Sequence, residues 1–338
     1  MRSLADIVGS LPVLRPARPL LTTVTALGLV LGSAFGWALQ VTDLQAPQSF
    51  LADPNGGGYF ISNANGEPDG RDNNGFITKL DTDGKVTNPQ FIRGGDGRTV
   101  LHAPKGLAIV GKTLYVADLD AVRGFDVETG NPVITVAFPA NARGTATTAP
   151  SLADLAHDGH GVLYASDPAA NAIYRIDTTK QHAVSVLVRD DRLAGPKGLA
   201  LHPKTGLLIA VSFNKGMIHA IAPDGTITEL VSNSILTGRF RNLDGVDFDT
   251  WGNMYVSDPT AGKIWRIRPD QRFDVIAEFL PSPGDIAVDR KNHLILVPYQ
   301  YSNAAEMNGL EAPVKGDKKK RTLADYGFGK PREGAKGK

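Results

Sequence analysis

Three short motifs carry residue types and spacings that can do chemistry. Residues 106–113 read G-x-x-x-x-G-K-T, the pattern of a P-loop, in which backbone N–H groups and a lysine hold phosphates at the start of a helix. His157 and His160 form H-x-x-H, a spacing found in zinc sites. A polar segment carries three carboxylates, the oxygen ligands that calcium prefers: Glu67, Asp69 and Asp72.

None of these motifs has the surroundings that its chemistry needs. The stretch after Thr113, "LYVADLDAVRGFDV", is rich in β-branched and aromatic residues and has no 3.6-residue apolar period. It predicts a strand, so the Gly-Lys pair is expected at the tip of a β-hairpin that binds no nucleotide. The histidines have no third ligand nearby and indicate an exposed turn. The acidic segment lacks a full EF-type loop and is expected to lean over a binding surface, and no G-x-S-x-G elbow supports a serine hydrolase.

The elements that position these residues repeat along the chain. The five residues "PKGLA" occur at both Pro104 and Pro196, and aligned apolar strands start six units, at Pro47, Pro104, Leu152, Pro196, Leu243 and Pro283. Each start is followed by a turn, a second strand such as "TLYVADL", a third and a weaker fourth. Four short antiparallel strands in roughly 45 residues are typical of a β-propeller blade. We therefore predict an all-β, six-bladed β-propeller, with "ALQVTDL" closing the last blade as its outer strand.

The segments "LADLAHDGHGVLYASD…NAIYRID" and "NLDGVDFDTWGNMYVSD…GKIWRIRPD" resemble NHL-type propellers. More closely, they resemble the gluconolactonase and senescence-marker-like six-bladed family, over about residues 42 to 305. That resemblance implies a lactone hydrolase in which a divalent cation lies at one mouth of the channel. Its implied ligands are a Glu in blade one, an Asn in blade four and an Asp in blade five.

The chain departs from that ligand pattern. Asp244 matches the blade-five Asp, but Gln48 stands at the Glu position, Lys197 at the blade-four Asn position and Ala153 at a further Asn position in blade three. An amide and an ammonium in place of these ligands remove one negative charge and add a repelling cation. These substitutions indicate that the channel mouth binds no metal. Asp244 is a calcium or zinc ligand only if the chain is a lactonase.

Because the chain reverses between the first and second strands of a blade, the first residues of all six inner strands lie at one mouth. Lys105 and Lys197 are expected there, placed to neutralise Asp154, Asp244 and Asp285. A structural network that closes the channel is one interpretation. The other is a binding site in which the two ammonium groups hold an acidic small molecule or a peptide carboxylate. Its candidate ligand-binding residues are Lys105, Lys197, Asp154, Asp244, Asp285 and Gln48.

The two ends of the chain differ from its body. Residues 1–38 carry Arg2, Arg15 and Arg18 ahead of a long apolar run and are expected to form a signal peptide or membrane-anchor helix. Residues 312–338 form a basic flexible tail with charge +6. Since the whole chain has a net charge of +1 and residues 1–38 carry +2, the body at 39–311 carries −7. The chain has no cysteine, which excludes disulfides and thiolate metal sites.

Together these patterns predict an exported, periplasmic or otherwise extracytoplasmic protein that acts as a monomer. Its function is predicted to be binding or scaffolding, without a cofactor, and its partners a small acidic molecule or another protein. An acidic body outside the cytoplasm argues against nucleic acid. The alternative from a different class is a lactonase that activates water with calcium or zinc.

Overall fold

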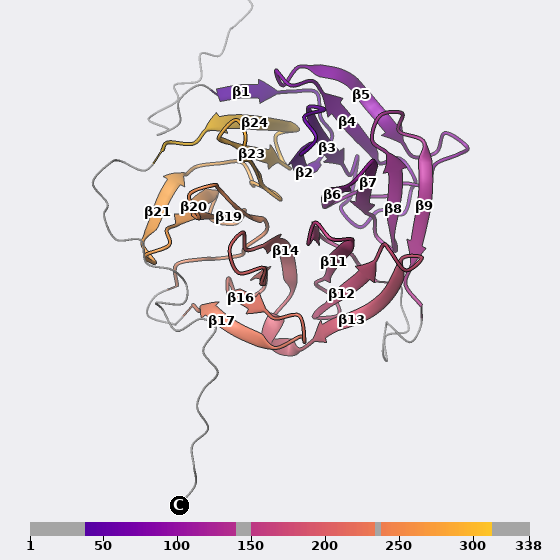
Figure 1. The fold of residues 1–338 in the computed structure, drawn as a ribbon. Helices are drawn as coiled ribbons and strands as arrows, with labels where there is room; N and C mark the ends of the chain where they lie inside the picture. Colours follow the sequence, from indigo (N-terminus) through magenta and orange to yellow (C-terminus); the bar gives the residue numbers. More distant parts are fainter. Residues whose placement is uncertain (1–37, 140–149, 234–237, 313–338) are drawn as a thin grey trace, which may run out of the picture. The chain divides into compact units, whose positions relative to one another are not determined.

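The computed structural model describes residues 38–139, 150–233 and 238–312. These residues form six four-stranded antiparallel sheets that follow one another around a ring, as Figure 1 shows. In each sheet the first strand of the repeat lies next to the channel and the later strands lie progressively farther out. The six-bladed β-propeller predicted from the repeats is therefore confirmed.

The first three blades take consecutive strands along the chain. Blade one contains β2 (Pro47–Ala52), β3 (Tyr59–Asn63), β4 (Phe76–Leu80) and β5 (Val86–Arg93). Blade two contains β6 (Leu107–Val110), β7 (Thr113–Ala117), β8 (Ala121–Asp126) and β9 (Pro132–Ala137). Blade three contains β10 (Leu155–His157), β11 (Val162–Asp167), β12 (Ala172–Asp177) and β13 (Ala183–Arg189).

The last three blades complete the ring. Blade four contains β14 (Pro196–Leu201), β15 (Leu208–Ser212), β16 (Ile218–Ile221) and β17 (Ile227–Val231), preceded by a 3-10 turn, η1 (Asp191–Leu193). Blade five contains β18 (Val246–Phe248), β19 (Met254–Asp258), β20 (Lys263–Ile267) and β21 (Phe273–Ala277). Blade six contains β22 (Ala287–Asp289), β23 (Leu294–Tyr299), β24 (Ala304–Gly309) and β1 (Ala38–Val41).

Blade six joins the two ends of the propeller sequence. Its outer strand β1 comes from the start of the described chain and pairs antiparallel with β24, with Ala38 opposite Asn308 and Val41 opposite Ala305. Without β1, the outer edge of β24 would expose unpaired backbone N–H and C=O groups. The closure expected from "ALQVTDL" is therefore confirmed.

The core of the propeller is divided among the gaps between blades. Among the described residues, each of the six gaps between blades holds a large buried apolar cluster, and a smaller seventh cluster of Ala64, Ala103 and Leu119 lies between blades one and two. Phe60 of blade one, for example, packs with Leu107 of blade two, and Val211 of blade four packs with Phe248 of blade five. Both faces of a blade are covered by its neighbours, which explains why the inner strands are largely apolar rather than alternating.

The segment with the P-loop pattern forms a β-hairpin. Val110 at the end of β6 pairs with Thr113 at the start of β7, and Gly111 and Lys112 are the two turn residues between them. Gly111 has a φ of 61°, a left-handed conformation that glycine adopts without a steric penalty. No helix follows the lysine, so the backbone here does not offer phosphates the N-terminus of a helix.

The predicted leader and tail fall almost wholly outside the described residues, apart from Ala38 of the first and Ala312 of the second. Within the described part of the chain, no helix has the length and apolar character needed to cross a bilayer.

Candidate functional site

The channel has two different ends. We call the end where the six inner strands begin the start mouth, and the end where they turn into the second strands the hairpin mouth. At the start mouth the equivalent second position of each repeat is occupied by Gln48, Lys105, Ala153, Lys197, Asp244 and Gly284. Three of these side chains carry charge, and they come from blades two, four and five.

Lys197 and Asp244 form the closest ion pair at the start mouth. The Lys197 Nζ lies 2.5 Å from Oδ2 of Asp244, and the same ammonium stands 4.8 Å from the centre of the Phe213 ring. The side chain of Asp244 is only 4% exposed, while that of Lys197 is 24% exposed. The expectation that Lys197 neutralises Asp244 therefore agrees with the geometry. Lys197 thus stands at the blade-four position where the family resemblance implies a neutral Asn ligand, and it binds the Asp244 carboxylate instead.

The ion-pair partner of Lys105 differs from the predicted one. Its Nζ lies 3.2 Å from Asp69, in the polar insertion between β3 and β4, instead of reaching the carboxylates of the channel. The Asp69 side chain is 79% exposed and that of Lys105 only 14% exposed. The acidic insertion thus reaches the start mouth and supplies a solvent-exposed counter-ion, in keeping with its expected place over the mouth.

Gln48 is held by other amide groups. Its side-chain Nε2 donates to the Ala46 carbonyl at 2.9 Å, and its Oε1 accepts from Gln300 Nε2 at 3.2 Å. No group of three or more His, Cys, Asp or Glu side chains with a metal-binding arrangement occurs among the described residues. Asp244 is engaged by an ammonium, so the donor set at this mouth does not fit a divalent ion, which needs several oxygen ligands.

Asp154 and Asp285 lie one residue farther along the inner strands. They come from blades three and six, which are opposite one another in a ring of six, and their carboxyl groups are hydrogen-bonded to each other. We call them the carboxyl pair. Glycines hold the equivalent position in blades two, four and five: Gly106, Gly198 and Gly245.

Each member of the carboxyl pair is also held by its surroundings. The backbone N–H groups of Leu155 and Leu199 donate to Asp154 at 2.6 and 2.7 Å, so this carboxyl group links blades three and four. The Ser49 hydroxyl donates to Asp285 at 2.6 Å, which links blades one and six. The pair therefore spans the channel and connects four of the six blades.

The carboxyl pair binds a proton more tightly than isolated aspartates do. Burial raises the pKa of Asp154 well above its ordinary value, and the charge of Asp285 raises it further. Burial also raises the pKa of Asp285 to about 7; the Asp244 charge adds to this rise and the Ser49 hydrogen bond opposes it. Two carboxylates this close cannot both be ionised cheaply, so near neutral pH the pair shares a proton and can both donate and accept hydrogen bonds.

A cavity of about 330 Å³ lies on the hairpin-mouth side of the carboxyl pair. Inner strands of all six blades line it, mostly with aliphatic side chains such as Leu107 and Ile286. Asp154, Asp285 and Ser49 also line this cavity, but Gln48, Lys105, Lys197 and Asp244 do not. The carboxyl pair thus separates the start mouth from the cavity, a division that the sequence did not predict.

The hairpin-mouth end of this cavity carries three further polar side chains. Arg290 donates to Oδ1 of Asp247, and the Val288 N–H donates to Oδ2 of the same carboxylate at 2.8 Å. His157 lines the cavity as well, and burial lowers its pKa. Its Nδ1 accepts from the Gly159 N–H at 3.2 Å. His160 is exposed in the turn, as expected, whereas His157 is the last residue of β10 and belongs to the cavity wall.

The aspartates that end the second strands have structural partners. Asp167 accepts from the Ala170 N–H at 3.1 Å, and Asp258 accepts from the Ala261 N–H at 2.9 Å, both in the turn that follows. Asp118 accepts from the Ala103 N–H at 3.0 Å and from Arg123 Nε at 2.8 Å. These carboxylates fix turns and blade connections.

Fold and site together define a six-bladed β-propeller with a lysine-bearing start mouth. No protein-family model matches the sequence, and neither does any curated protein. Similarity to solved structures is extensive, but it shows the fold alone because the sequence identities are low.

Three solved structures illustrate that similarity. Virginiamycin B lyase from Staphylococcus aureus has a TM-score of 0.57 and 13% identity, and the match covers 81% of this chain and 99% of that chain. A candidate gluconolactonase has a TM-score of 0.57 and 14% identity, with 81% and 94% covered. A protein of unknown function from Bacteroides thetaiotaomicron has a TM-score of 0.61 and 14% identity, with 79% and 70% covered.

Proposed function

We propose that this chain is a non-catalytic binding or scaffold protein whose start mouth binds an acidic small molecule or a carboxylate of a protein partner. The observation that supports this proposal is the Lys197–Asp244 ion pair at the place where a lactonase of this fold would hold its metal. Asp244 is the only residue that matches the implied metal ligands, and the Lys197 ammonium already neutralises its carboxylate, which therefore has no charge left for a metal cation.

Lys105 is the proposed contact for the ligand's carboxylate. Its partner Asp69 is largely solvent-exposed, and exposed ion pairs contribute little stability, about 0–1 kcal/mol. A ligand carboxylate can therefore displace Asp69 at small cost and gain an ammonium whose side chain is mostly buried. Lys197, with a quarter of its side chain exposed, adds positive charge on the same mouth.

Titration calorimetry with citrate, succinate and a peptide with a free C-terminal carboxylate tests this proposal. We expect saturable binding of at least one of these probes, weakened about tenfold by Lys105→Ala, since loss of one charge-assisted contact costs about 1.4 kcal/mol or more. Lys112→Ala, at the exposed β6–β7 hairpin, is the matched control and should leave binding unchanged. Equal affinities for the parent protein and Lys105→Ala would contradict the assignment.

A metal-dependent lactonase is the second candidate function. The similarity to a candidate gluconolactonase and the position of Asp244 favour it. In that case the protein would carry about one calcium or zinc ion per chain. Elemental analysis of purified protein separates the two functions. A stoichiometric metal that is lost in Asp244→Ala would overturn the binding proposal.

The converse substitution is a sharper test of the same idea. Gln48→Glu combined with Lys197→Asn restores the ligand types that the resemblance implies beside Asp244. The double variant should gain calcium or zinc affinity, visible as a metal-dependent rise in melting temperature, because a ligand that binds only the folded state stabilises it. The parent protein should show no such rise.

We further propose that the protein lies outside the cytoplasm, because three arginines precede the apolar run in residues 1–38 and the next basic residue is Arg71. We propose that it acts there as a monomer. Fractionation of producing cells should recover the chain from the periplasm or the membrane. Full-length chain with an intact N-terminus in the soluble cytoplasm would contradict this location.

A further inference from the structure

A second cavity, of about 280 Å³, lies between blades four and five and is separate from the channel. Its walls are mostly apolar and come from the outer strand of blade four and from the four strands of blade five: Leu230, Val231, Phe248, Met254, Ile267 and Phe273. It is close in size to the smaller ligand pockets of proteins, which are concave and mostly apolar with a few polar groups.

The first polar group in this cavity is a histidine without a full set of partners. His202, just after β14, is only 7% exposed and lines the cavity. Its Nδ1 accepts from the Thr205 N–H at 3.1 Å, which leaves the ring hydrogen on Nε2 in the neutral imidazole. None of the other residues that the structure describes accepts a hydrogen bond from this Nε2. The ring also packs edge-on against Phe248, with the centroids 5.0 Å apart.

Burial and the nearby Lys204 charge lower the pKa of His202, so the ring is neutral at pH 7. A neutral imidazole has one N–H donor, here on Nε2, and a ligand in the cavity can accept from it. An acceptor bound in the cavity would complete the hydrogen bonding of His202.

The charge around this cavity is one-sided. Lys204 lines it, is exposed and has no ion-pair partner among the described residues, and no acidic side chain contributes to the lining. The Lys204 Nζ lies 3.6 Å from the position that a Cβ on Gly252 would take, so it stands over another lining residue. Arg239 adds positive charge near the wall by stacking on the Phe273 ring at 3.8 Å.

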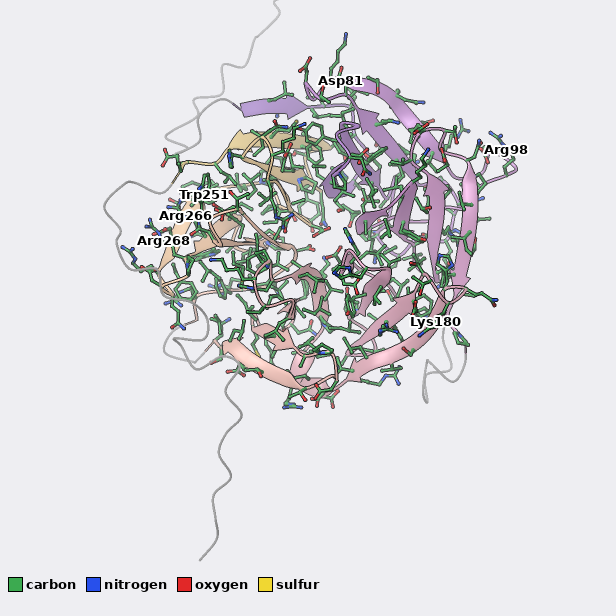
Figure 2. All side chains as sticks on the ribbon, in the orientation of Figure 1. Asp81, Arg98, Lys180, Trp251, Arg266 and Arg268 are labelled. Atoms are coloured by element: carbon green, nitrogen blue, oxygen red, sulfur yellow. The ribbon has the colours of Figure 1, made fainter. Side chains whose placement is uncertain are left out.

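Arg268 also lines the cavity, but its guanidinium group is already engaged by a carboxylate. Its Nε donates to Asp274 at 2.6 Å, and Arg266 contacts the same carboxylate at 3.0 Å. Figure 2 labels both arginines at the periphery of blade five, away from the channel. Lys204 is therefore the cation that a ligand can use.

We propose that this interblade cavity binds a small apolar carboxylic acid, such as a medium-chain fatty acid. The carboxylate accepts from the Lys204 ammonium and from Nε2 of His202, and the hydrocarbon part lies between Phe248, Met254 and Phe273. This site is independent of the start mouth, because it shares no residue with it.

Octanoate is the probe that tests the proposal, with octanol as its uncharged analogue. Titration calorimetry at pH 7 should show one octanoate per chain. Octanol should bind at least tenfold more weakly, since it carries no charge for Lys204. Lys204→Glu should weaken octanoate binding at least tenfold, and His202→Phe, which keeps an aromatic ring against Phe248, should weaken it severalfold. Lys112→Glu is the control for the change in net charge and should have no effect.

Two further variants locate the bound probe. Met254→Trp fills the cavity and should abolish octanoate binding, whereas Lys105→Ala at the start mouth should leave it unchanged. The proposal is overturned if octanoate does not bind, if octanol binds equally well, or if Lys204→Glu binds octanoate as tightly as the parent protein. It is also overturned if Lys105→Ala, instead of Lys204→Glu, abolishes binding. Thermal melts of each variant establish that the protein tested is folded.

Discussion

The carboxyl pair shows how neighbours decide the protonation of a single residue. Asp154 accepts two backbone N–H bonds and Asp285 accepts a serine hydroxyl, and all of these favour the ionised form. Burial and mutual repulsion oppose them and prevail, so both pKa values rise. Lys197 does not relieve the repulsion, because its ammonium contacts Asp244. A shared proton takes the place of a counter-ion.

This proton makes the stability of the propeller depend on pH. The pKa of Asp285 is about 7 in the folded protein and that of an aspartate in an unfolded chain is about 3.9. The folded state therefore binds more protons between these values. The stability that this group contributes is fully present below about pH 4 and is lost as the pH rises through 7.

Asp285→Asn tests that dependence, because its amide can donate to Asp154 at every pH. We expect the unfolding free energy of the variant, relative to the parent protein, to rise by about 2 kcal/mol between pH 4.5 and pH 8. The full pKa shift of Asp285 corresponds to a larger change in unfolding free energy, at about 1.4 kcal/mol per pKa unit. We expect less because solvent in the cavity screens this half-buried carboxyl group. Urea unfolding at the two pH values measures the change. Asp83→Asn, at an exposed turn, should show no trend.

The sequence predicted the residue types of the site better than their partners. The repeat alignment placed Lys105, Lys197 and Asp244 at one mouth, because equivalent positions in repeats take equivalent places in a ring. It could not predict that Lys105 pairs with Asp69, because that contact depends on how the insertion between β3 and β4 folds back over the mouth. The shared proton also escaped prediction, because it depends on the width of the channel where Asp154 meets Asp285.

At the scale of the strands, the third position of the inner strands sets how closely the blades approach. A Cβ on Gly245 would lie 2.3 Å from the Ile286 nitrogen and 2.9 Å from Oδ1 of Asp285. A Cβ on Gly106 would lie 2.3 Å from Oδ1 of Asp154. The glycines thus leave the space in which opposite carboxyl groups reach one another. This is a packing requirement, because the φ angles of these two glycines lie outside the left-handed region.

Gly245→Ala should therefore destabilise the protein through contact alone. We expect a loss of about 3 kcal/mol, the upper part of the range for forced overpacking, because the clash is with backbone that cannot move alone. Gly111→Ala is the comparison: its Cβ meets open space but its φ is positive, so it should cost about 1 kcal/mol. Denaturant unfolding of both variants measures the difference. A smaller loss for Gly245→Ala than for Gly111→Ala would contradict the close-approach argument.

The two copies of "PKGLA" show how one strand serves different sites. In blade two the sequence continues as "VGKT" and makes a tight hairpin, while in blade four it continues as "HPKT" and places His202 and Lys204 beside an apolar cavity. The repeat predicted the strand in both copies. The cavity could not be predicted, because its other walls come from the outer strand of blade four and from blade five.

At the scale of the whole propeller, stability is shared among six similar contacts between neighbouring blades. That arrangement made the fold predictable, because short apolar strands at regular spacing reveal each blade separately. It also makes ring closure critical, since the first and last blades meet only if the two ends of the propeller sequence combine. Val41 of β1 is 4% exposed and packs in the cluster that joins blades six and one.

Removal of β1 should open this closure. We expect a chain that begins at residue 43 to lose about 3 kcal/mol relative to one that begins at residue 38. It loses the burial of Val41, worth about 1.5–3 kcal/mol, and the hydrogen bonds of the β1–β24 ladder. The exposed edge of β24 should also pair with other molecules, so light scattering should rise with protein concentration. Equal melting temperatures and equal scattering for the two chains would show that β24 does not need its outer partner.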